Sequence, residues 1–154
     1  MKLPFPNHCN ATQACASLTT PLRIAFRDCD PMGVLWHGNY LAYCEQARHL
    51  LAEQLGFGVP DLRAQGRFAP VVRSQVMHRE PLRAEEMASV EVALFPSRHP
   101  RLYHRYQLFT ASGALSAIAE TEQVLTDREL TMLLQIPPEL AAVFARRPDE
   151  PAGL

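Results

Sequence analysis

The sequence lacks a strong charge of one sign and any long apolar run. Fifteen Lys and Arg residues face 16 Asp and Glu residues, which gives a formal net charge of −1. This balance argues against a nucleic-acid binder that relies on a basic field and against a polybasic membrane tether. No apolar run approaches the ~20 residues of a bilayer-spanning helix. The N-terminal residues are broken by prolines and lack the apolar stretch of a secretion signal, so we expect a cytoplasmic protein that binds neither membrane nor nucleic acid.

The sequence also has few cysteines. Cys9, Cys15, Cys29 and Cys44 form no Cys-x-x-Cys pair, and no histidine lies at zinc-finger spacing from them. A chain of 154 residues that is 47% apolar is long enough to bury one substantial core without a disulfide scaffold. We therefore expect one domain with reduced thiols and no metal.

The hydrophobic pattern predicts one long helix and five strands. Apolar residues recur at steps of three and four from Tyr40 to Leu55, which is typical of a helix, and Gly56 follows at the position that favours a positive φ. Asn39 is a natural N-cap for this helix. Alternating or apolar runs predict the remaining elements, namely strands over Leu22–Arg27, Phe68–Arg79, 89–94, Leu102–Thr110 and Ala114–Thr126, and a short helix over Pro138–Arg146.

The order of these elements is a strand, a long helix and then four strands joined mostly by short turns. Such an order predicts an α+β fold with an antiparallel sheet against which the helix buries its apolar stripe. Ala117, Ala119 and Thr121 share one face of the last strand, and their small side chains predict a close approach of the helix there. We expect a flexible tail over 1–20, the domain over 21–145 and a second tail over 146–154.

Candidate catalytic residues lie between the first strand and the long helix. A helix N-terminus offers unpaired backbone N–H groups that polarise a carbonyl oxygen or stabilise an oxyanion. Asp30 lies seven residues before His37 and is a candidate nucleophile or general base. Asp-x-Asp-Pro followed by Gly is also an ordinary turn, so these residues alone leave open a turn-forming role for Asp30.

The same segment resembles the signature of the 4-hydroxybenzoyl-CoA thioesterase-like hot-dog proteins, a family of small acyl-CoA thioesterases. That signature is an Asp-x-Asp-x-x-Gly turn, an apolar pair, an aromatic residue, His or Tyr, and a helix that starts near Asn-Tyr and carries Glu-x-x-Arg. The matching residues are Asp28, Asp30, Gly33, Val34-Leu35, Trp36, His37, Asn39-Tyr40, Glu45 and Arg48. Downstream, Val76–Arg83 resembles the family's Tyr-x-Arg-Pro-Leu-Arg stretch, with His78 where Tyr is common, and Ile136–Leu140 resembles its usual end.

The resemblance implies a hot-dog fold, in which a curved antiparallel sheet wraps around one central helix. It implies dimers whose sheets join edge to edge, with active sites at the subunit interface, and dimers that commonly pair into a homotetramer. It also implies hydrolysis of an acyl-CoA thioester to a free acid and a thiol, without a metal or any cofactor beyond the coenzyme A of the substrate.

The resemblance assigns roles to particular residues. Asp30 matches the catalytic carboxylate, as nucleophile or as general base on water. The backbone N–H of His37 matches the group that polarises the thioester carbonyl, and its ring matches the family branch with His at this place. The candidate substrate-binding residues are Trp36, Gly38 and Tyr40, with Arg98 and Arg101 toward the coenzyme A phosphates. We interpret Asp28 as a residue that bonds turn amides, and Glu45 and Arg48 as a structural pair reaching toward the Asp turn.

Other functions stay open at this point. An acyl-ACP thioesterase is an alternative because both carriers end in phosphopantetheine. A hydroxyacyl dehydratase and a non-catalytic acyl-thioester binder are further alternatives, since a fold does not fix a function. The sequence offers no physical reason to choose between an aryl and a medium-chain acyl group.

Overall fold

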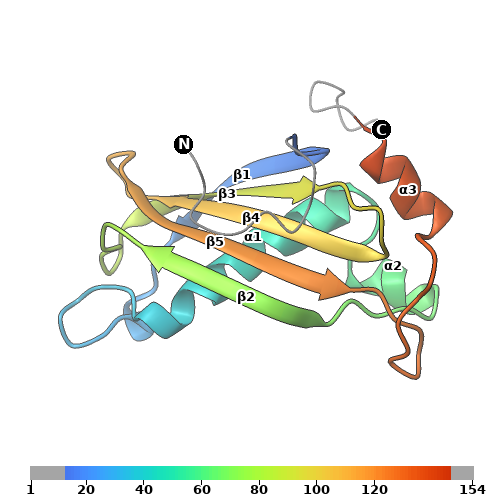
Figure 1. The fold of residues 1–154 in the computed structure, drawn as a ribbon. Helices are drawn as coiled ribbons and strands as arrows, with labels where there is room; N and C mark the ends of the chain where they lie inside the picture. The colour runs from blue at the N-terminus through green and yellow to red at the C-terminus, as the bar shows by residue number, and fades with distance from the viewer. Residues whose placement is uncertain (1–12, 147–154) are drawn as a thin grey trace.

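The computed structural model describes residues 13–146, which form one curved sheet packed on a long helix. The five strands are antiparallel to their neighbours and follow the order β1-β3-β4-β5-β2, so β1 and β2 are the edges (Figure 1). The strands are β1 (Ala16–Arg23), β2 (Val71–His78), β3 (Met87–Phe95), β4 (Arg101–Phe109) and β5 (Leu115–Val124). This arrangement confirms the α+β class predicted from the order of elements.

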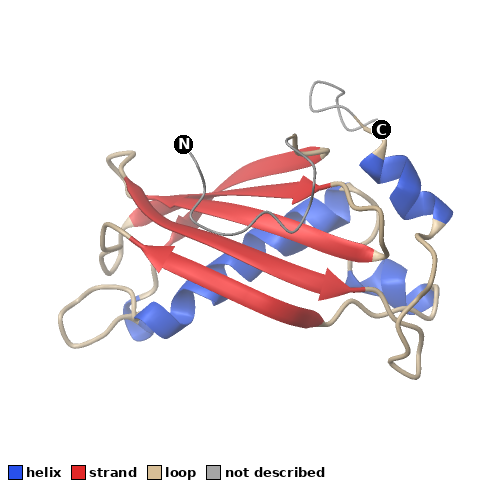
Figure 2. Cartoon of the chain, viewed as in Figure 1, coloured by secondary structure: helices blue, strands red, loops and turns tan. Residues whose placement is uncertain are grey.

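The helices leave one face of the sheet without helical cover (Figure 2). The long helix α1 (Tyr40–Gln54) crosses the other face, which we call the inner face. The short helices α2 (Val59–Ala64) and α3 (Pro138–Phe144) lie toward the end of the molecule where α1 finishes (Figure 1). Gly56 follows α1 with a φ of +76°, as the sequence predicts for the residue that ends this helix.

The core lies between α1 and the inner face. Along β3 and β4, every second side chain is buried, and these residues, apart from His104, form one hydrophobic cluster with the stripe of α1. Tyr106 is the largest fully buried side chain of this cluster. Burying such a side chain contributes roughly 1.5–3 kcal/mol, so the packing of α1 on these strands is a main source of stability.

The position of α1 differs from the expected one. The helix approaches β1 and β3 most closely, not the small residues of β5. Ala117 and Ala119 are fully buried, but the large Tyr106 lies directly beside Ala119 in the neighbouring strand. Small side chains on β5 therefore make room for a bulky neighbour within the sheet.

The first strand begins earlier than expected. β1 covers Ala16–Arg23 and pairs with β3, whereas the expected strand over Leu22–Arg27 gives way to a 3₁₀ turn at Phe26–Asp28. The alternation of exposed and half-buried side chains starts at Ala16, inside the segment 1–20 assigned to a tail. Residues 1–12 and 147–154, which make up most of the two expected tails, lie outside the described residues.

Two general expectations concern thiols and membrane spans. Cys15, Cys29 and Cys44 are free, and burial raises the pKa of Cys15 to about 11 and that of Cys44 to about 12, so both stay protonated near neutral pH. Within residues 13–146, no helix combines the length and the apolar character needed to cross a membrane.

Candidate active site

A narrow loop carries the two aspartates from the first strand to the long helix. Cys29 and Leu35 pair across it, and the Trp36 N–H donates to the Asp28 carbonyl at 3.0 Å. At its tip, the Gly33 N–H donates to the Asp30 carbonyl at 2.9 Å, and Gly33 has a φ of +77° that favours glycine. The loop thus folds back so that Asp30 lies at its tip and Trp36 lies at the entry to the helix.

Asp30 is partly buried, and the turn holds one of its two carboxylate oxygens. Oδ1 accepts hydrogen bonds from the backbone N–H of Met32 at 2.8 Å and of Val34 at 3.4 Å. Among residues 13–146, Oδ2 has no hydrogen-bond partner. The turn-forming role is therefore real, and it leaves one oxygen of an oriented carboxylate available for chemistry.

Asp28 fastens the loop to the helix, although its partner is not the one expected. Its Oδ2 accepts from the Tyr43 hydroxyl at 2.8 Å rather than from turn amides, and that hydroxyl accepts from the Ala25 N–H at 2.9 Å. Asn39 stands at the N-cap position but forms no side-chain cap; it donates to the Asp28 carbonyl at 2.9 Å. Asp28 and Asn39 therefore hold the loop against α1.

The chain enters α1 through a 3₁₀ turn over His37–Asn39. Within the described part of the chain, the backbone N–H groups of His37 and Gly38 have no backbone acceptor. The Trp36 indole lies against Gly38 so closely that a Cβ there would overlap the ring. The glycine therefore lets the indole lie at the helix entry, next to two open N–H groups.

The aromatic residues extend this site to the edge strand β2. Tyr40 is buried at the start of α1, and its ring meets the His78 ring edge-on, with 4.5 Å between centroids. The exposed His37 ring lies 5.0 Å from that of Trp36. Burial, with a smaller effect of His37, lowers the pKa of His78, so His78 is mostly neutral near pH 7. His78 was not among our candidate site residues, although its place in the Tyr-x-Arg-Pro-Leu-Arg-like stretch was a signal for it.

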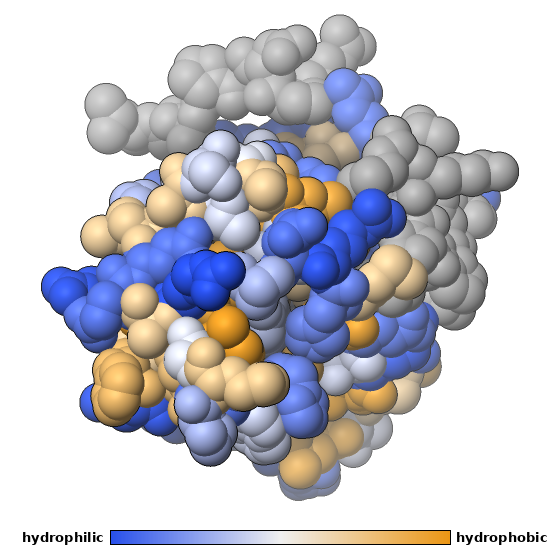
Figure 3. Space-filling view, turned by 90° about the vertical axis from the view of Figure 1, so that its left-hand side faces the viewer, coloured by the Kyte–Doolittle hydropathy of each residue, from blue (hydrophilic) through white to orange (hydrophobic). Residues whose placement is uncertain are grey.

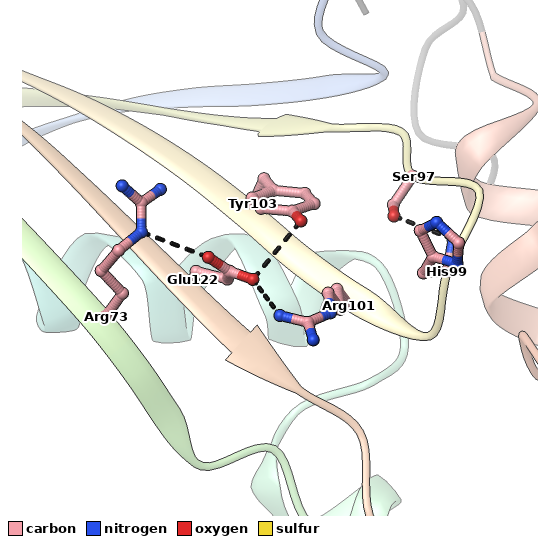
Figure 4. A network of polar contacts seen from close by, with 6 residues as sticks. All are labelled: Arg73, Ser97, His99, Arg101, Tyr103 and Glu122. Atoms are coloured by element: carbon pink, nitrogen blue, oxygen red, sulfur yellow. Dashed lines mark hydrogen bonds and ion pairs between the residues drawn. The ribbon is translucent and has the colours of Figure 1, made fainter. Parts of the chain in front are cut away.

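The two candidate coenzyme A arginines lie elsewhere. Arg98 is exposed in the loop between β3 and β4. This loop lies at the opposite end of the molecule from the loop that carries the aspartates (Figure 1). Arg101 forms an ion pair with Glu122, which also accepts from Arg73 at 3.2 Å and from the Tyr103 hydroxyl at 3.4 Å (Figure 4). Burial raises the pKa of Glu122, but the bonds from Arg101 and Arg73 outweigh it and hold that pKa below its usual value. One chain does not bring these arginines to Asp30.

The end that carries the aspartate loop exposes apolar side chains among polar ones (Figure 3). Phe26 and Met32, on either side of the two aspartates in sequence, are 74% and 81% exposed, and Trp36 is 48% exposed. Large apolar side chains at this level of exposure mark a surface suited to a ligand or another protein.

A second feature is a cavity beside the C-terminal half of α1. Its volume is about 690 Å³, including solvent at its mouth, and it is bounded by α1, α2 and the inner face of β4 and β5. Arg48, His104 and Gln123 contribute polar groups to its lining. The Arg48 guanidinium pairs with Glu45 at 2.9 Å under the helix, and its charge acts on His104 and Tyr106, so the expected reach toward the Asp turn is not found.

Metal-binding side chains do not converge in this structure. Among residues 13–146, no three His, Cys, Asp or Glu side chains lie together in a way that could hold a metal ion. The chemical groups of the candidate site are the Asp28 and Asp30 carboxylates, imidazole rings and backbone N–H groups.

Comparison with known proteins places this geometry in context. Residues 24–144 match the sequence profile described as the Thioesterase-like superfamily. The chain is 28% identical over 108 residues to a putative acyl-CoA thioesterase, YneP, of Bacillus subtilis, covering 70% of this chain and 78% of that protein. It is 29% identical over 142 residues to the 1,4-dihydroxy-2-naphthoyl-CoA hydrolase of Thermosynechococcus vestitus, covering 85% of this chain and 94% of that protein.

Solved structures share the fold. The DHNA-CoA thioesterase from Staphylococcus aureus superposes with a TM-score of 0.78 at 23% identity, covering 84% of this chain and 89% of that one. The likeness in fold confirms the expected hot-dog architecture of a curved antiparallel sheet around a central helix.

Proposed function

The chain belongs to the Thioesterase-like superfamily, and from that membership we propose that it hydrolyses acyl-CoA thioesters at the entry of α1. The observation that carries the proposal is the presence on one short segment of an oriented carboxylate with an open oxygen and a helix entry with open N–H groups. Two relatives with 28% and 29% identity are named for the same chemistry.

The reaction needs a polarised carbonyl and an activated oxygen nucleophile. The thioester carbonyl oxygen accepts from the His37 N–H, where the helix entry stabilises the negative charge that develops on it. Asp30 then either attacks the carbonyl carbon, giving an anhydride that water opens, or takes a proton from a water that attacks directly. Either route breaks the C–S bond, adds one water and releases a carboxylic acid and the coenzyme A thiol.

The side chains around this point have distinct tasks in the proposal. Trp36 and Gly38 form the wall of the site at the helix entry, and Tyr40 supports it from beneath. The His37 ring orients water or the substrate. Arg98 and Arg101 bind the coenzyme A phosphates only if a second copy brings them near Asp30, because one chain holds them at its other end.

A second copy fits the edge of the sheet. β2 is an edge strand that begins and ends in exposed residues, and its outer backbone groups have no strand beside them among the described residues. Antiparallel pairing of two β2 strands would place the start of one strand beside the end of the other, and so bring one copy's β3–β4 loop toward the other copy's Asp30. Light scattering tests the dimer, and Ser74→Pro in β2 should weaken it.

The test of the function is a panel of aryl and aliphatic CoA thioesters, with thiol release followed by a thiol reagent. We expect turnover of at least one of them by the wild-type protein. To identify the carrier, kcat/KM for the best CoA thioester is compared with kcat/KM for the same acyl group on ACP. A lower value for the ACP thioester supports coenzyme A as the carrier. A complex with a CoA ester that stays intact for hours would instead make the protein a binder.

The arginine roles need a separate control. The same acyl group on N-acetylcysteamine lacks all phosphates, so Arg98→Gln should raise KM for the CoA ester several-fold and leave KM for the truncated thioester unchanged. Equal effects on both thioesters would remove Arg98 from phosphate binding.

A further inference from the structure

The cavity beside α1 has a polar floor that the catalytic proposal does not use. His104 and Gln123 both line it and are only 3% and 7% exposed. Their Nδ1 and Oε1 atoms are buried, and within the described residues neither has a hydrogen-bond partner. Gln123 is held in place because its Nε2 donates to the Ala69 carbonyl at 2.5 Å. Unpaired buried polar atoms are costly, about 1–3 kcal/mol each, and both belong to residues that line one cavity, so they point to a ligand that pairs with them.

The charges around the floor indicate a neutral ligand group. Burial, with a smaller effect of Arg48, lowers the pKa of His104 to about 3, so the ring is uncharged at neutral pH. Arg48 is already paired with Glu45. The Gln123 Oε1 atom accepts a hydrogen bond and cannot donate one. A hydroxyl group satisfies these conditions, since it donates to Gln123 Oε1, accepts from the Nδ1–H tautomer of His104 and carries no charge.

Outside the floor, the exposed part of the lining carries Glu45, His49 and Arg63, Arg67 is half-buried, and the rest of the lining is apolar. Phe57, Leu62, Phe68 and Leu102 contribute carbon surface to the same cavity. A group that enters is therefore mostly hydrocarbon, with its polar atom at the floor.

The register of the sheet gives the distance from the thioester site to this floor. His104 pairs with Thr121, which pairs with Ser74 in β2, and Ser74 lies four residues before His78 in the same strand. At ~3.3 Å per residue this separation is about 13 Å along the strand. The helix gives a similar value, because the rise from the His37 N–H to the turn of Glu45, where the cavity begins, is also about 13 Å.

The inner face of β2 connects the two places. Ser74 and His78 are exposed and Val76 is half-buried, although their register partners Thr121, Ala117 and Ala119 in β5 are buried. The helix lies mainly over β1 and β3, and its first residue, Tyr40, contacts His78 at one end of this strip. An extended hydrocarbon chain can lie on the strip between Tyr40 and the cavity.

We propose that the cavity selects acyl groups of medium length that carry a hydroxyl near their far end, and that His104 and Gln123 recognise this hydroxyl. The inference rests on the proposed thioesterase function and adds the substrate class to it. A chain of roughly ten carbons spans the 13 Å that the strand geometry gives.

The test compares two CoA thioesters that differ in one atom, decanoyl-CoA and its ω-hydroxylated counterpart. The wild-type protein should prefer the hydroxylated ester by about tenfold in kcat/KM, the worth of one net hydrogen bond. His104→Leu and Gln123→Met should abolish most of this preference, and His104→Asn, which restores a polar atom, should keep part of it. Equal kcat/KM values for the two esters in the wild-type protein would overturn the inference and leave the thioesterase function standing.

Two further measurements keep the outcomes separate. If neither ester is hydrolysed, calorimetric titration measures the binding of the two free acids instead. Tighter binding of the hydroxylated acid by the wild-type protein, and not by the His104→Leu and Gln123→Met variants, supports the role of the cavity. His104→Leu should raise the Tm of the free protein, because it removes an unpaired buried atom, by about 2–4 °C. A folded His104→Leu protein with unchanged preference would show that His104 recognises nothing.

Discussion

The two ends of α1 are built in different ways. At its N-terminus, the groups that matter come from one short segment, and Asp28, Asn39 and Tyr43 lock that segment together with hydrogen bonds of 2.8–2.9 Å. At its C-terminal half, the polar groups come from three distant elements, α1, β4 and β5, and some of their atoms have no partner within the described chain. Among the described residues, the first region has no buried side-chain polar atom without a partner, whereas the second has two at its floor. We infer that the region at the N-terminus of α1 positions reacting groups, and that the region at its C-terminal half binds part of a ligand.

The largest expected effect on stability concerns the cavity beside the C-terminal half of α1 at acid pH. Burial lowers the pKa of His104 from 6.5 to about 3, so the unfolded chain binds a proton that the folded protein does not, and the free energy of unfolding falls as the pH drops from 6.5 toward 3. Between pH 7.5 and pH 5, the free energy of unfolding of the His104→Leu protein should therefore fall by about 2 kcal/mol less than that of the wild-type protein. Urea unfolding of both proteins at pH 7.5 and pH 5 measures this. Parallel pH profiles would mean that His104 is not held neutral.

The next effect concerns the lock at the other end. Tyr43→Phe removes the hydroxyl that joins Ala25 to Asp28 and leaves two partners unpaired, which should cost about 1–2 kcal/mol of unfolding free energy. Burial raises the pKa of this hydroxyl, so the loss should be the same at pH 6 and pH 8. Urea unfolding measures it, and a cost near zero would show that the loop is held by other contacts.

Gly38→Ala should affect activity more than stability. The new methyl group overlaps the Trp36 ring, so the indole must leave the helix entry, and we expect a loss of about tenfold in kcat/KM. Trp36 is the one tryptophan in the sequence, so its fluorescence reports the displacement directly. In a Trp36→Ala background the same change should cost little. An equal cost in both backgrounds would mean that the indole is not what Gly38 accommodates.

The smallest effect is expected outside both regions. Arg101→Gln leaves Glu122 with Arg73 as a partner, so the free energy of unfolding should fall by under about 1 kcal/mol. The matched change Arg98→Gln, at an exposed loop position, should have no measurable effect on stability. Thermal denaturation of both variants tests this, and a larger loss for Arg98→Gln would reveal a contact that the single chain does not show.

The contrast between the two ends also explains what the sequence could predict. The turn residues Asp28 to Gly33, the helix from Tyr40 and the terminating Gly56 follow local rules, and the structure has each of them in place. The start of β1 at Ala16 was missed because Ser17, Thr19 and Pro21 look like loop residues until β3 pairs with them. The family resemblance supplied the hot-dog architecture, which spacing alone could not.

The cavity was out of reach of the sequence for a physical reason. His104 lies in the apolar phase of β4, between Leu102 and Tyr106, and that polar interruption was the only local signal. Its meaning depends on Gln123 in the next strand and on Arg48 from the helix, which are 19 and 56 residues away in the sequence. Long-range register decides such a grouping, and no local pattern encodes it.

The central claim, that the open oxygen of Asp30 acts on a thioester held at the helix entry, is tested most directly by Asp30→Asn. Asparagine keeps an Oδ1 acceptor for Met32 and Val34, so the turn should survive while the charge is lost. We expect kcat on the best CoA thioester to fall about 10²–10⁴-fold with little change in Tm, and the matched Asp28→Asn protein to keep most of its kcat and lose stability. A folded Asp30→Asn protein with wild-type kcat would contradict the account.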